Sequence, residues 1–328
     1  MVERAEPDAV VAARAAPPGV RGGRGGWAVA GIAGALAGVL AFHRAVPNTP
    51  GRVGSLLESF LPWLGVAVAL LLAVALVRRS AVALVSVLLP VAAWVHLFGG
   101  LLLPGTGGGV RELTVVQHNV SDENRDPAAT ARALIEAGAD LVALEELVAP
   151  QLAVYEKALA ADYPHHVVRG TVGLWSTYPL SGERPVDIKP ADIPEGWSRG
   201  VRAVVHSPYG DVAAYVAHLP SVRIGAGGLA SQRRDESARL LGRAVAAERT
   251  DAVILLGDLN GAVEDRGLAP LTSRLNVAER GFAFSFPAAF PVARIDQVMA
   301  RSATVGHIRT LPATGSDHLP VLARVALR

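Results

Sequence analysis

Polar side chains that could do chemistry lie where apolar segments end or begin in the last two thirds of the chain. The segments "LTVVQHN", "DLVALEEL", "DVAAYVAHL" and "DAVILLGDLN" each finish in such residues, and "RIDQVMA" and "SDHLPVLARVAL" start with them. Together they supply Asn119, Glu146, His218, Asp258, Asn260, Asp296, Asp317 and His318. Because a rigid sheet edge points several side chains at one place, residues at the ends of packed strands are expected to form a shared site.

The side-chain types in this set indicate one kind of chemistry. Carboxylate and carboxamide oxygens suit Mg²⁺, Mn²⁺ or Ca²⁺, and two histidines suit proton transfer near neutral pH. Each residue alone has a simpler explanation, since Glu146 could be a solvated strand end, His218 a half-buried histidine, and Asp296 a partner for Arg294. Their recurrence at strand ends favours a functional site that holds a divalent metal.

The segments that carry these residues alternate between strand and helix patterns. Residues 113–116 form a predicted strand, and the helix that follows has Asp126 as its N-cap, Pro127 in its first turn and Gly138 near its end. "SQRRDESARLLGRAVAAE" has the periodicity of an amphipathic helix, whereas the polar-ended segments are short and rich in β-forming residues. Alternating strands and helices predict a layered α/β domain.

The first third of the chain has a different composition. Mean hydropathy is +0.35 and only 18% of the residues are charged, which is too apolar for an ordinary soluble enzyme of this size. The excess lies in three uncharged stretches, which predict transmembrane helices at 27–43, 61–77 and 81–103. The alternatives are buried core helices for all three, or a signal peptide for the first.

Arginines indicate how these spans are oriented. The tail 1–26 carries four arginines and the turn between the second and third spans carries two, against two in the loop 43–60. By the positive-inside rule, the N-terminus is cytoplasmic and everything after the third span is outside the plasma membrane. We expect a disordered basic tail over 1–26, a Gly/Pro linker over 104–110 and an extracytoplasmic catalytic domain over 111–328.

Residues 111–328 do not have the charge of a general nucleic-acid binder. They contain 23 Lys and Arg against 25 Asp and Glu, a net charge of about −2, although the whole chain has a pI of about 9.2. A broad basic groove is therefore not indicated, which argues against nucleic acid as the partner. The sequence makes no prediction about protein partners.

Two further segments carry residues that could contact a substrate. "GWSRGVR" carries Trp197, Arg199 and Arg202, and the loop after His218 carries Arg223. The alternative is that Trp197 packs against its neighbours and the arginines lie in solvent. From this group, Trp197, Arg202 and Arg223 are the candidate substrate contacts.

Six motifs, in this order, are similar to those of a known family. The series "LTVVQHN", "DLVALEEL", "YVAHL", "ILLGDLN", "RIDQV" and "GSDHLPV" resembles the endonuclease/exonuclease/phosphatase superfamily. The resemblance implies a DNase-like four-layer α/β/β/α sandwich, preceded here by three transmembrane helices. It also implies a divalent-metal phosphohydrolase that uses Mg²⁺, or else Mn²⁺ or Ca²⁺. One departure is Glu145, where the family often has glutamine.

The same resemblance implies a role for each site residue. Asn119 and Glu146 would hold the metal, with Glu146 as the main ligand, and Asp317 would support the metal side. Asp258 would orient or deprotonate the attacking water, and Asn260 would contact the phosphate.

The resemblance implies a separate role for each of the two histidines. His318, oriented by Asp296, would act as general base or acid, and His218 would stabilise the charge on the phosphorus centre and the leaving group. A phosphodiester or pyrophosphate is anionic, so its charge must be neutralised before a nucleophile attacks. We expect the metal and a protonated His218 to supply this neutralisation.

The front of the chain carries a second resemblance. Three spans followed by this domain, with "SLLESFLPWLGV" entering the second span and "RRSAVALVSVLLPVAAWVHLFG" forming the third, are similar to membrane-anchored teicoplanin-resistance (VanJ-like) proteins of actinobacteria. This similarity implies a membrane-embedded phosphoesterase acting on a lipid-linked cell-wall phosphate such as undecaprenyl pyrophosphate. The alternatives are an extracellular metal-dependent nuclease, which needs a basic groove, and a non-catalytic binding module. Intact metal and histidine positions argue against the binding module.

Overall fold

The computed structural model describes residues 24–104 and 111–328, so most of the predicted tail and of the predicted linker lies outside the described residues. Its α-helices are α1 (Arg24–Phe42), α2 (Val53–Ser59), α3 (Leu64–Val77), α4 (Ala81–Phe98), α5 (Pro127–Glu136), α6 (Gln151–Leu159), α7 (Gln232–Ala246) and α8 (Ala269–Thr272). Short 3₁₀ helices are η1 (His43–Ala45), η2 (Leu61–Trp63), η3 (Gly99–Leu102) and η4 (Arg266–Leu268).

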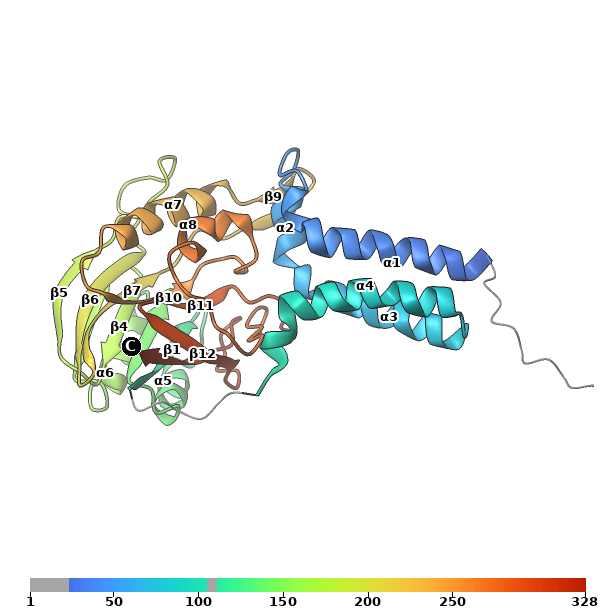
Figure 1. Ribbon diagram of the computed structural model, residues 1–328. Helices are drawn as coiled ribbons and strands as arrows, with labels where there is room; N and C mark the ends of the chain where they lie inside the picture. Colours follow the sequence, from blue (N-terminus) through green and yellow to red (C-terminus); the bar gives the residue numbers. More distant parts are fainter. Residues whose placement is uncertain (1–23, 105–110) are drawn as a thin grey trace, which may run out of the picture.

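Helices α1, α3 and α4 lie side by side and extend away from the rest of the molecule (Figure 1). Among the described residues, α1 and α4 are long and apolar enough to cross a membrane. The prediction at 61–77 corresponds to η2 and α3, which follow α2 with a bend of 64° and complete a third span only if the bent pair is counted as one. Pro62 cannot donate the backbone hydrogen bond that would continue α2, which explains the break.

Two large sheets form the body of the domain, in the part of the chain that the structure describes. The first has the strand order β12-β13-β1-β2-β4-β3 and the second the order β11-β10-β7-β6-β5, while β8 and β9 form a separate hairpin. The strands are β1 (Glu112–Asn119), β2 (Leu141–Glu145), β3 (His165–Arg169), β4 (Val172–Ser176), β5 (Leu180–Pro185), β6 (Gly200–Ser207), β7 (Gly210–Ala217), β8 (Arg223–Gly225), β9 (Gly228–Ala230), β10 (Ala252–Asp258), β11 (Asp296–Arg301), β12 (Ala303–Thr310) and β13 (Val321–Leu327). β1 is parallel to β2 and antiparallel to β13, and β10 is parallel to β7 and antiparallel to β11.

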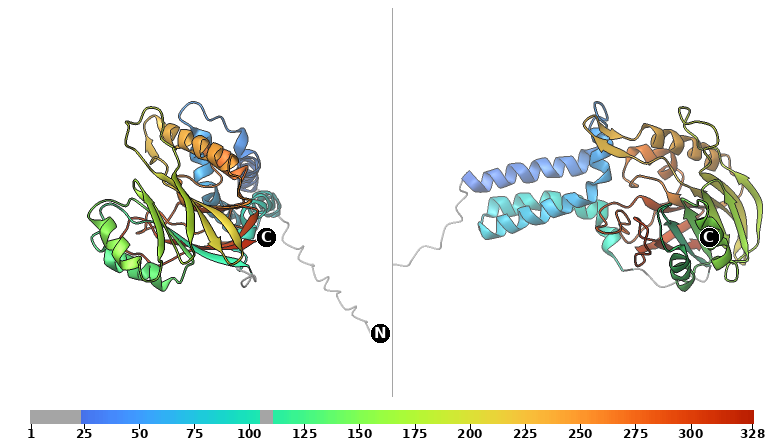
Figure 2. Two further views of the ribbon diagram at one scale, coloured as in Figure 1. Left: turned by 90° about the vertical axis from the view of Figure 1, so that its left-hand side faces the viewer. Right: turned by 180° about the vertical axis from the view of Figure 1, so that it is seen from behind.

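The strands alternate in the face that each residue buries. Val115 and Ile254 belong to the apolar core between the two sheets. Their neighbours face outward, so that Val116 packs against α5 and α6, and Leu255 packs against α7 and α8. The two helix layers therefore cover opposite sides of the paired sheets (Figure 2). This arrangement confirms the predicted two-sheet α/β sandwich.

The helix after β1 begins where the sequence predicts it. The carboxylate of Asp126 accepts a hydrogen bond from the backbone N–H of Ala129 at 2.9 Å, and Pro127 is the first helical residue of α5. A cap of this kind contributes about 1 kcal/mol to helix stability. It fixes where the chain turns after β1 has delivered Asn119 to the edge of the sheet.

The loop between α1 and α3 contacts the two-sheet domain directly, and α2 lies beside β9 (Figure 1). The buried carboxylate of Glu58 accepts hydrogen bonds from Nε and Nη2 of Arg266 at 2.8 Å each and from its backbone N–H at 2.9 Å. Arg52 forms a further ion pair with Asp235 in the first turn of α7. The domain is therefore held to the end of the helices through the loop 43–60, and not only by the predicted linker.

Loss of the Arg266 side chain is expected to loosen this contact. In Arg266→Ala the buried Glu58 carboxylate loses both guanidinium hydrogen bonds and keeps only the backbone N–H of residue 266 and His43 Nδ1, which costs about 3 kcal/mol. We expect a lower Tm for the full chain in detergent micelles. Arg274→Ala is the control, because Arg274 is exposed and bonds to the adjacent Pro270 and Ser273. Equal melting temperatures for the two variants would contradict the docking role of Arg266.

Candidate active site

Several strand ends meet at one edge of the two sheets. β1 ends at Asn119, β2 ends one residue before Glu146, and β10 ends at Asp258. The antiparallel strand β11 begins at Asp296, which lies opposite Asp258 in the register. His318 lies in the loop that enters β13. Parallel strands bring their carboxyl ends, and antiparallel strands their amino ends, to the same edge, which is why residues far apart in sequence meet there.

A glycine allows the ends of β7 and β10 to approach each other. Gly257 has φ +153°, and a Cβ at this position would lie 1.9 Å from the carbonyl oxygen of Ala217. Only glycine fits so close to another backbone. The approach leaves Asp258 Oδ2 3.6 Å from Nε2 of His218, the residue that follows β7.

The turns after β2 and β10 adopt left-handed backbone conformations, with φ of 61° at Glu146 and 47° at Asn260. Non-glycine residues hold such angles only where surrounding contacts fix them. The backbone N–H of Asn260 donates to Asp258 Oδ1 at 2.9 Å, and its Nδ2 donates to the carbonyl of Leu219 at 2.9 Å. The buried Arg234 donates to the Asn260 carbonyl at 3.1 Å. Asn260 is thereby positioned at the edge of the site, and its contact with phosphate stays a prediction.

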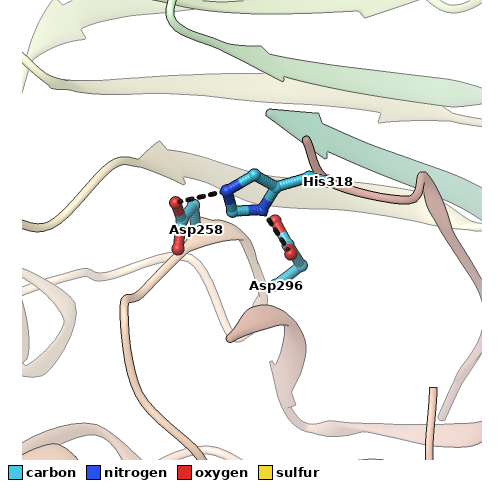
Figure 3. Close-up of side chains that lie close together, drawn as sticks. All are labelled: Asp258, Asp296 and His318. Atoms are coloured by element: carbon cyan, nitrogen blue, oxygen red, sulfur yellow. Dashed lines mark hydrogen bonds and ion pairs between the residues drawn. The ribbon is translucent and has the colours of Figure 1, made fainter. Parts of the chain in front are cut away.

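His318 forms a buried pair with Asp296 (Figure 3). The imidazole Nδ1 lies 2.8 Å from Asp296 Oδ2, while Nε2 lies 3.8 Å from Asp258 Oδ2. Asp296 accepts two more hydrogen bonds, from the hydroxyl of Ser285 and from Nε2 of Gln117. The bond at Nδ1 orients the ring and turns Nε2 toward Asp258, as a histidine that transfers protons requires.

The charges of the cluster favour a protonated His318. Burial disfavours the imidazolium, but the carboxylates of Asp296 and Asp258 more than offset it and raise the pKa of His318 to about 10. For Asp296, burial is outweighed by His318 and by the hydrogen bonds it accepts, so its pKa is lowered. Burial and the nearby Asp296 raise the pKa of Asp258 to about 7, against the opposing effect of His318. At neutral pH His318 therefore carries a proton that it can donate.

Polar side chains converge in two overlapping groups whose carboxylate oxygens could hold a metal ion. In the first, Asn119 Nδ2 donates hydrogen bonds to Glu146 Oε1 and Asp258 Oδ2 at 3.1 and 3.2 Å and so brings the two carboxylates together. Asp258, Asp296 and His318 also present ligand atoms within 4.8 Å of one another. Carboxylates crowded in this way repel each other unless a proton or cation lies between them. The donor set is mainly oxygen, so it fits a divalent ion of the Mg²⁺ type.

Asp317 lies apart from both groups. The residues on either side of it, Ser316 and His318, are buried, whereas Asp317 is exposed in the bend that they form. Its backbone carbonyl accepts a hydrogen bond from the N–H of Ala288 at 2.7 Å. This exposed position therefore does not favour the predicted role of Asp317 in supporting the metal.

His218 is buried and uncharged. Burial, followed by the guanidinium of Arg199, lowers the pKa of His218 to about 3. Burial and this permanent cation therefore favour a neutral imidazole over the protonated His218 that the sequence predicts, against the carboxylates of Glu146 and Asp258 at 3.8 and 3.6 Å from its Nε2. The positive charge at this point belongs to Arg199, whose Nη1 lies 3.2 Å from Nδ1 of His218.

Comparison with known families identifies this arrangement. The profile of the Endonuclease/Exonuclease/phosphatase family matches residues 116–318, which is more than half of the chain. The chain belongs to this family. The match begins within β1 and ends at His318, so it encloses all the strand-end residues described above. Comparison with curated proteins finds no significant match.

Solved structures show the same endonuclease/exonuclease/phosphatase fold. A mannosyl-6-phosphatase from Bacteroides thetaiotaomicron is 19% identical, with a TM-score of 0.52 over 66% of this chain and 100% of that chain. A mutant beta toxin from Staphylococcus aureus with bound magnesium ions is 14% identical, with a TM-score of 0.51 over 66% and 100%. A humanized D. rerio TDP2 is 17% identical, with a TM-score of 0.51 over 65% and 98%. At these identities the comparison shows the fold alone.

A cavity of about 650 Å³ opens beside Arg199, which contacts His218. Trp197, Arg199 and Arg223 are among its lining residues, and the guanidinium carbon of Arg199 lies 5.3 Å from the centre of the Trp197 ring. The structure thus brings two of the predicted substrate contacts together with Arg199. In an endonuclease/exonuclease/phosphatase domain, basic walls next to a metal-capable group suit an anionic substrate.

Arg202 lies elsewhere. It is buried on the outer face of the second sheet, where its Nε and Nη2 donate to the carboxylate of Glu248 at 2.9 and 3.0 Å, and Nη1 donates to the carbonyl of Gly182 at 3.2 Å. The prediction that Arg202 contacts substrate is therefore not supported. Along β6, Arg202 alternates with core residues such as Val201 and Ala203, which turns it toward the helix layer.

Two residues that support the site are absent from the sequence-based set. Gln117 bridges Asp296 and the buried Glu145, donating to their carboxylates at 3.0 and 2.7 Å. Gln117 lies two positions before Asn119 on β1, so the strand period of two could have placed it on the same face. Ser285 lies in a long irregular segment, where no periodicity indicates its contact with Asp296.

Proposed function

We propose that this member of the family is a metal-dependent phosphoesterase that works at a membrane surface. The observation that carries the proposal is the buried Asp296–His318 pair, which lies next to the carboxylates of Glu146 and Asp258. A protonated imidazole beside clustered oxygen ligands is an arrangement that phosphate-ester hydrolysis uses.

Asn119, Glu146 and Asp258 would hold the metal ion, which we propose to be Mg²⁺, with Mn²⁺ or Ca²⁺ as alternatives. When bound, such an ion neutralises phosphate charge and lowers the pKa of a coordinated water. The magnesium ions in the related beta toxin structure support this choice.

The protein's own groups divide the remaining work. Asp258, which lies between Asn119 Nδ2 and His318 Nε2, orients the attacking water and accepts its proton. His318 donates a proton to the leaving oxygen through Nε2, while Asp296 holds the ring at Nδ1. Arg199, rather than a protonated His218, stabilises the negative charge that develops on the phosphoryl oxygens.

We propose a lipid-linked phosphate or pyrophosphate, such as undecaprenyl pyrophosphate, as the substrate. The apolar helices and the contacts of the loop 43–60 with the domain support a site close to a bilayer, where lipid substrates are concentrated. The net charge of about −2 over residues 111–328 gives no support to a general nuclease. A role in teicoplanin resistance follows only from the similarity of the N-terminal region and is part of this proposal.

One assay tests the activity and separates the substrate classes. The full chain in detergent micelles should release phosphate from undecaprenyl pyrophosphate in Mg²⁺ or Mn²⁺, and excess EDTA should abolish the release. Plasmid DNA under the same conditions should stay intact. Full activity in chelator would rule out the metal-dependent mechanism, and DNA cleavage without phosphate release would instead identify a nuclease.

We also propose that the catalytic domain lies outside the cell membrane, with the N-terminus in the cytoplasm. Six arginines lie in the tail and in the turn after α3, against two in the loop 43–60, which contacts the catalytic domain and so shares its side of the membrane. A reporter enzyme fused after Arg328 should be active only when it is exported. Activity of a cytoplasm-specific reporter at this position would reverse the orientation.

A further inference from the structure

An apolar cavity of about 450 Å³ lies between the helix bundle and the catalytic domain, outside the site described above. Its volume falls in the range of about 300–1,000 Å³ that is typical of small-molecule pockets. Its lining residues are Pro62, Trp63, Gly65, Val66, Val68, Ala69, Leu72, Val91, Trp94, Val95, Phe282 and Phe284. Helices α3 and α4 supply most of this lining, and the two phenylalanines come from the loop before β11.

The polar groups of the two tryptophans are bonded to carbonyl groups of the chain. Trp63 Nε1 donates to the carbonyl of Val292 at 2.7 Å, and Trp94 Nε1 donates to the carbonyl of Pro62 at 2.8 Å. The lining therefore offers hydrocarbon and aromatic surface, with Trp63 stacked on Phe284 at 5.3 Å between ring centres. A water molecule is poorly stabilised in such a cavity, because it finds few hydrogen-bond partners there. An apolar ligand suits it.

The loop that closes this cavity also forms one wall of the active site. Phe284 lines the cavity, the next residue Ser285 bonds to Asp296, and the ring of Phe286 lies 4.8 Å from that of His318. Three consecutive residues of one loop therefore join the cavity wall to His318.

The same side of the domain carries its exposed apolar side chains. Among the described residues of 111–328, the large hydrophobic residues that are exposed are Ile224 and Phe290, at 63% and 73%. Ile224 lies in the β8–β9 hairpin, whose Leu229 bonds to the backbone of Gly51, and Phe290 lies in the loop that contacts Trp63. Both residues thus border the end of the helix bundle, as expected for a face that rests on lipid.

We propose that this cavity holds the first part of the hydrocarbon chain of a lipid-phosphate substrate while the phosphate reaches His318. The inference rests on the proposed phosphoesterase function and adds to it the site that selects a lipid. Three observations carry it: the apolar lining, the position between membrane-length helices and the domain, and the shared loop 282–286. A membrane lipid that only fills the cavity is the competing occupant, and the experiments below separate the two.

The first experiment measures binding without catalysis. The full chain in phosphatidylcholine nanodiscs with Mg²⁺ is irradiated with a non-hydrolysable phosphonate analogue of farnesyl phosphate that carries a diazirine in its isoprenoid chain. We expect labelled peptides from α3, α4 and the 282–286 loop, and several-fold weaker labelling by the matching farnesol analogue. Equal labelling by the two probes would mean that the cavity takes any lipid, and would overturn the proposal.

A cavity-filling variant provides the matched comparison. Ala69→Phe places a ring in the cavity, whereas Ala73→Phe places the same ring on an exposed position of the same helix that does not line it. Ala69→Phe should lower labelling by the farnesyl phosphate analogue several-fold, and Ala73→Phe should leave it unchanged. Val95→Phe fills the cavity from α4 and should reproduce the loss if Ala69→Phe does not fold. Unchanged labelling in the folded cavity variants would overturn the proposal.

Kinetics then test selection of the chain. The ratio of kcat/KM for farnesyl pyrophosphate to kcat/KM for the short ester p-nitrophenyl phosphate should fall about tenfold in Ala69→Phe, since buried apolar contacts contribute to binding only the long chain. An unchanged ratio would contradict a chain-binding role. If neither compound is hydrolysed by the unmodified chain, the proposed function fails, and the labelling experiment still decides whether the cavity binds the lipid phosphate.

Discussion

Replacement of His318 by glutamine is expected to lower kcat by about 10³-fold, because a positioned proton donor contributes about 10²- to 10⁴-fold to such reactions. His318 Nδ1 is held by Asp296 at 2.8 Å, so the ring offers Nε2 to the reacting groups. Glutamine is of similar size and can keep a hydrogen bond to Asp296, but it cannot donate a proton to a leaving oxygen. We expect KM to change little, since binding rests on Arg199 and the metal-capable group.

The effect is measured as phosphate release under saturating substrate and Mg²⁺, with His307→Gln as the matched control. His307 is half-buried on β12, whereas His318 lies in the loop before β13. Both variants should melt near the temperature of the unmodified chain. A His318→Gln protein that is folded and retains a tenth or more of the activity would remove His318 from the proton-transfer step.

The positions at strand ends were predictable because the signal is local. A run of apolar residues that ends in Asn119 or Asp258 specifies both a buried strand and the polar group at its tip. The N-cap at Asp126 is similarly local, since one side chain bonds to a backbone N–H three residues on. Such features need no knowledge of what the strand packs against.

The protonation of His218 and the place of Arg202 depend on distant partners, and there the sequence misleads. His218 is neutral because the fold buries it and brings Arg199 beside it, and Arg202 is sequestered by Glu248, 46 residues further along the chain. The docking of Glu58 against Arg266 joins residues 208 positions apart. Contacts of this kind arise from tertiary packing, which no periodicity in a single segment encodes.

Asp258→Asn is expected to lower kcat by about 10³-fold or more, as in His318→Gln, because the Asp258 carboxylate takes part in both halves of the proposed reaction. Its Oδ2 lies 3.2 Å from Asn119 Nδ2 and 3.8 Å from His318 Nε2, between the metal-capable group and the proton donor. Asparagine keeps the size of the side chain but can neither accept the proton of the attacking water nor contribute a negative charge to a cation. Asp251→Asn is the control, since Asp251 is exposed just before the same strand.

A second readout distinguishes this role from a structural one. Asp258 is one of the carboxylates that raise the pKa of His318 to about 10, so Asp258→Asn should lower that pKa. The shift is measured in the metal-free full chain by NMR titration of the labelled imidazole, and Asp251→Asn should leave it in place. Calorimetry should also show weaker Mg²⁺ binding in Asp258→Asn alone. Suppose that activity is lost while the His318 pKa and the Mg²⁺ affinity are unchanged. Asp258 then does not link the metal-capable group to His318, and the cluster of Asp258, Asp296 and His318 does not act as one unit.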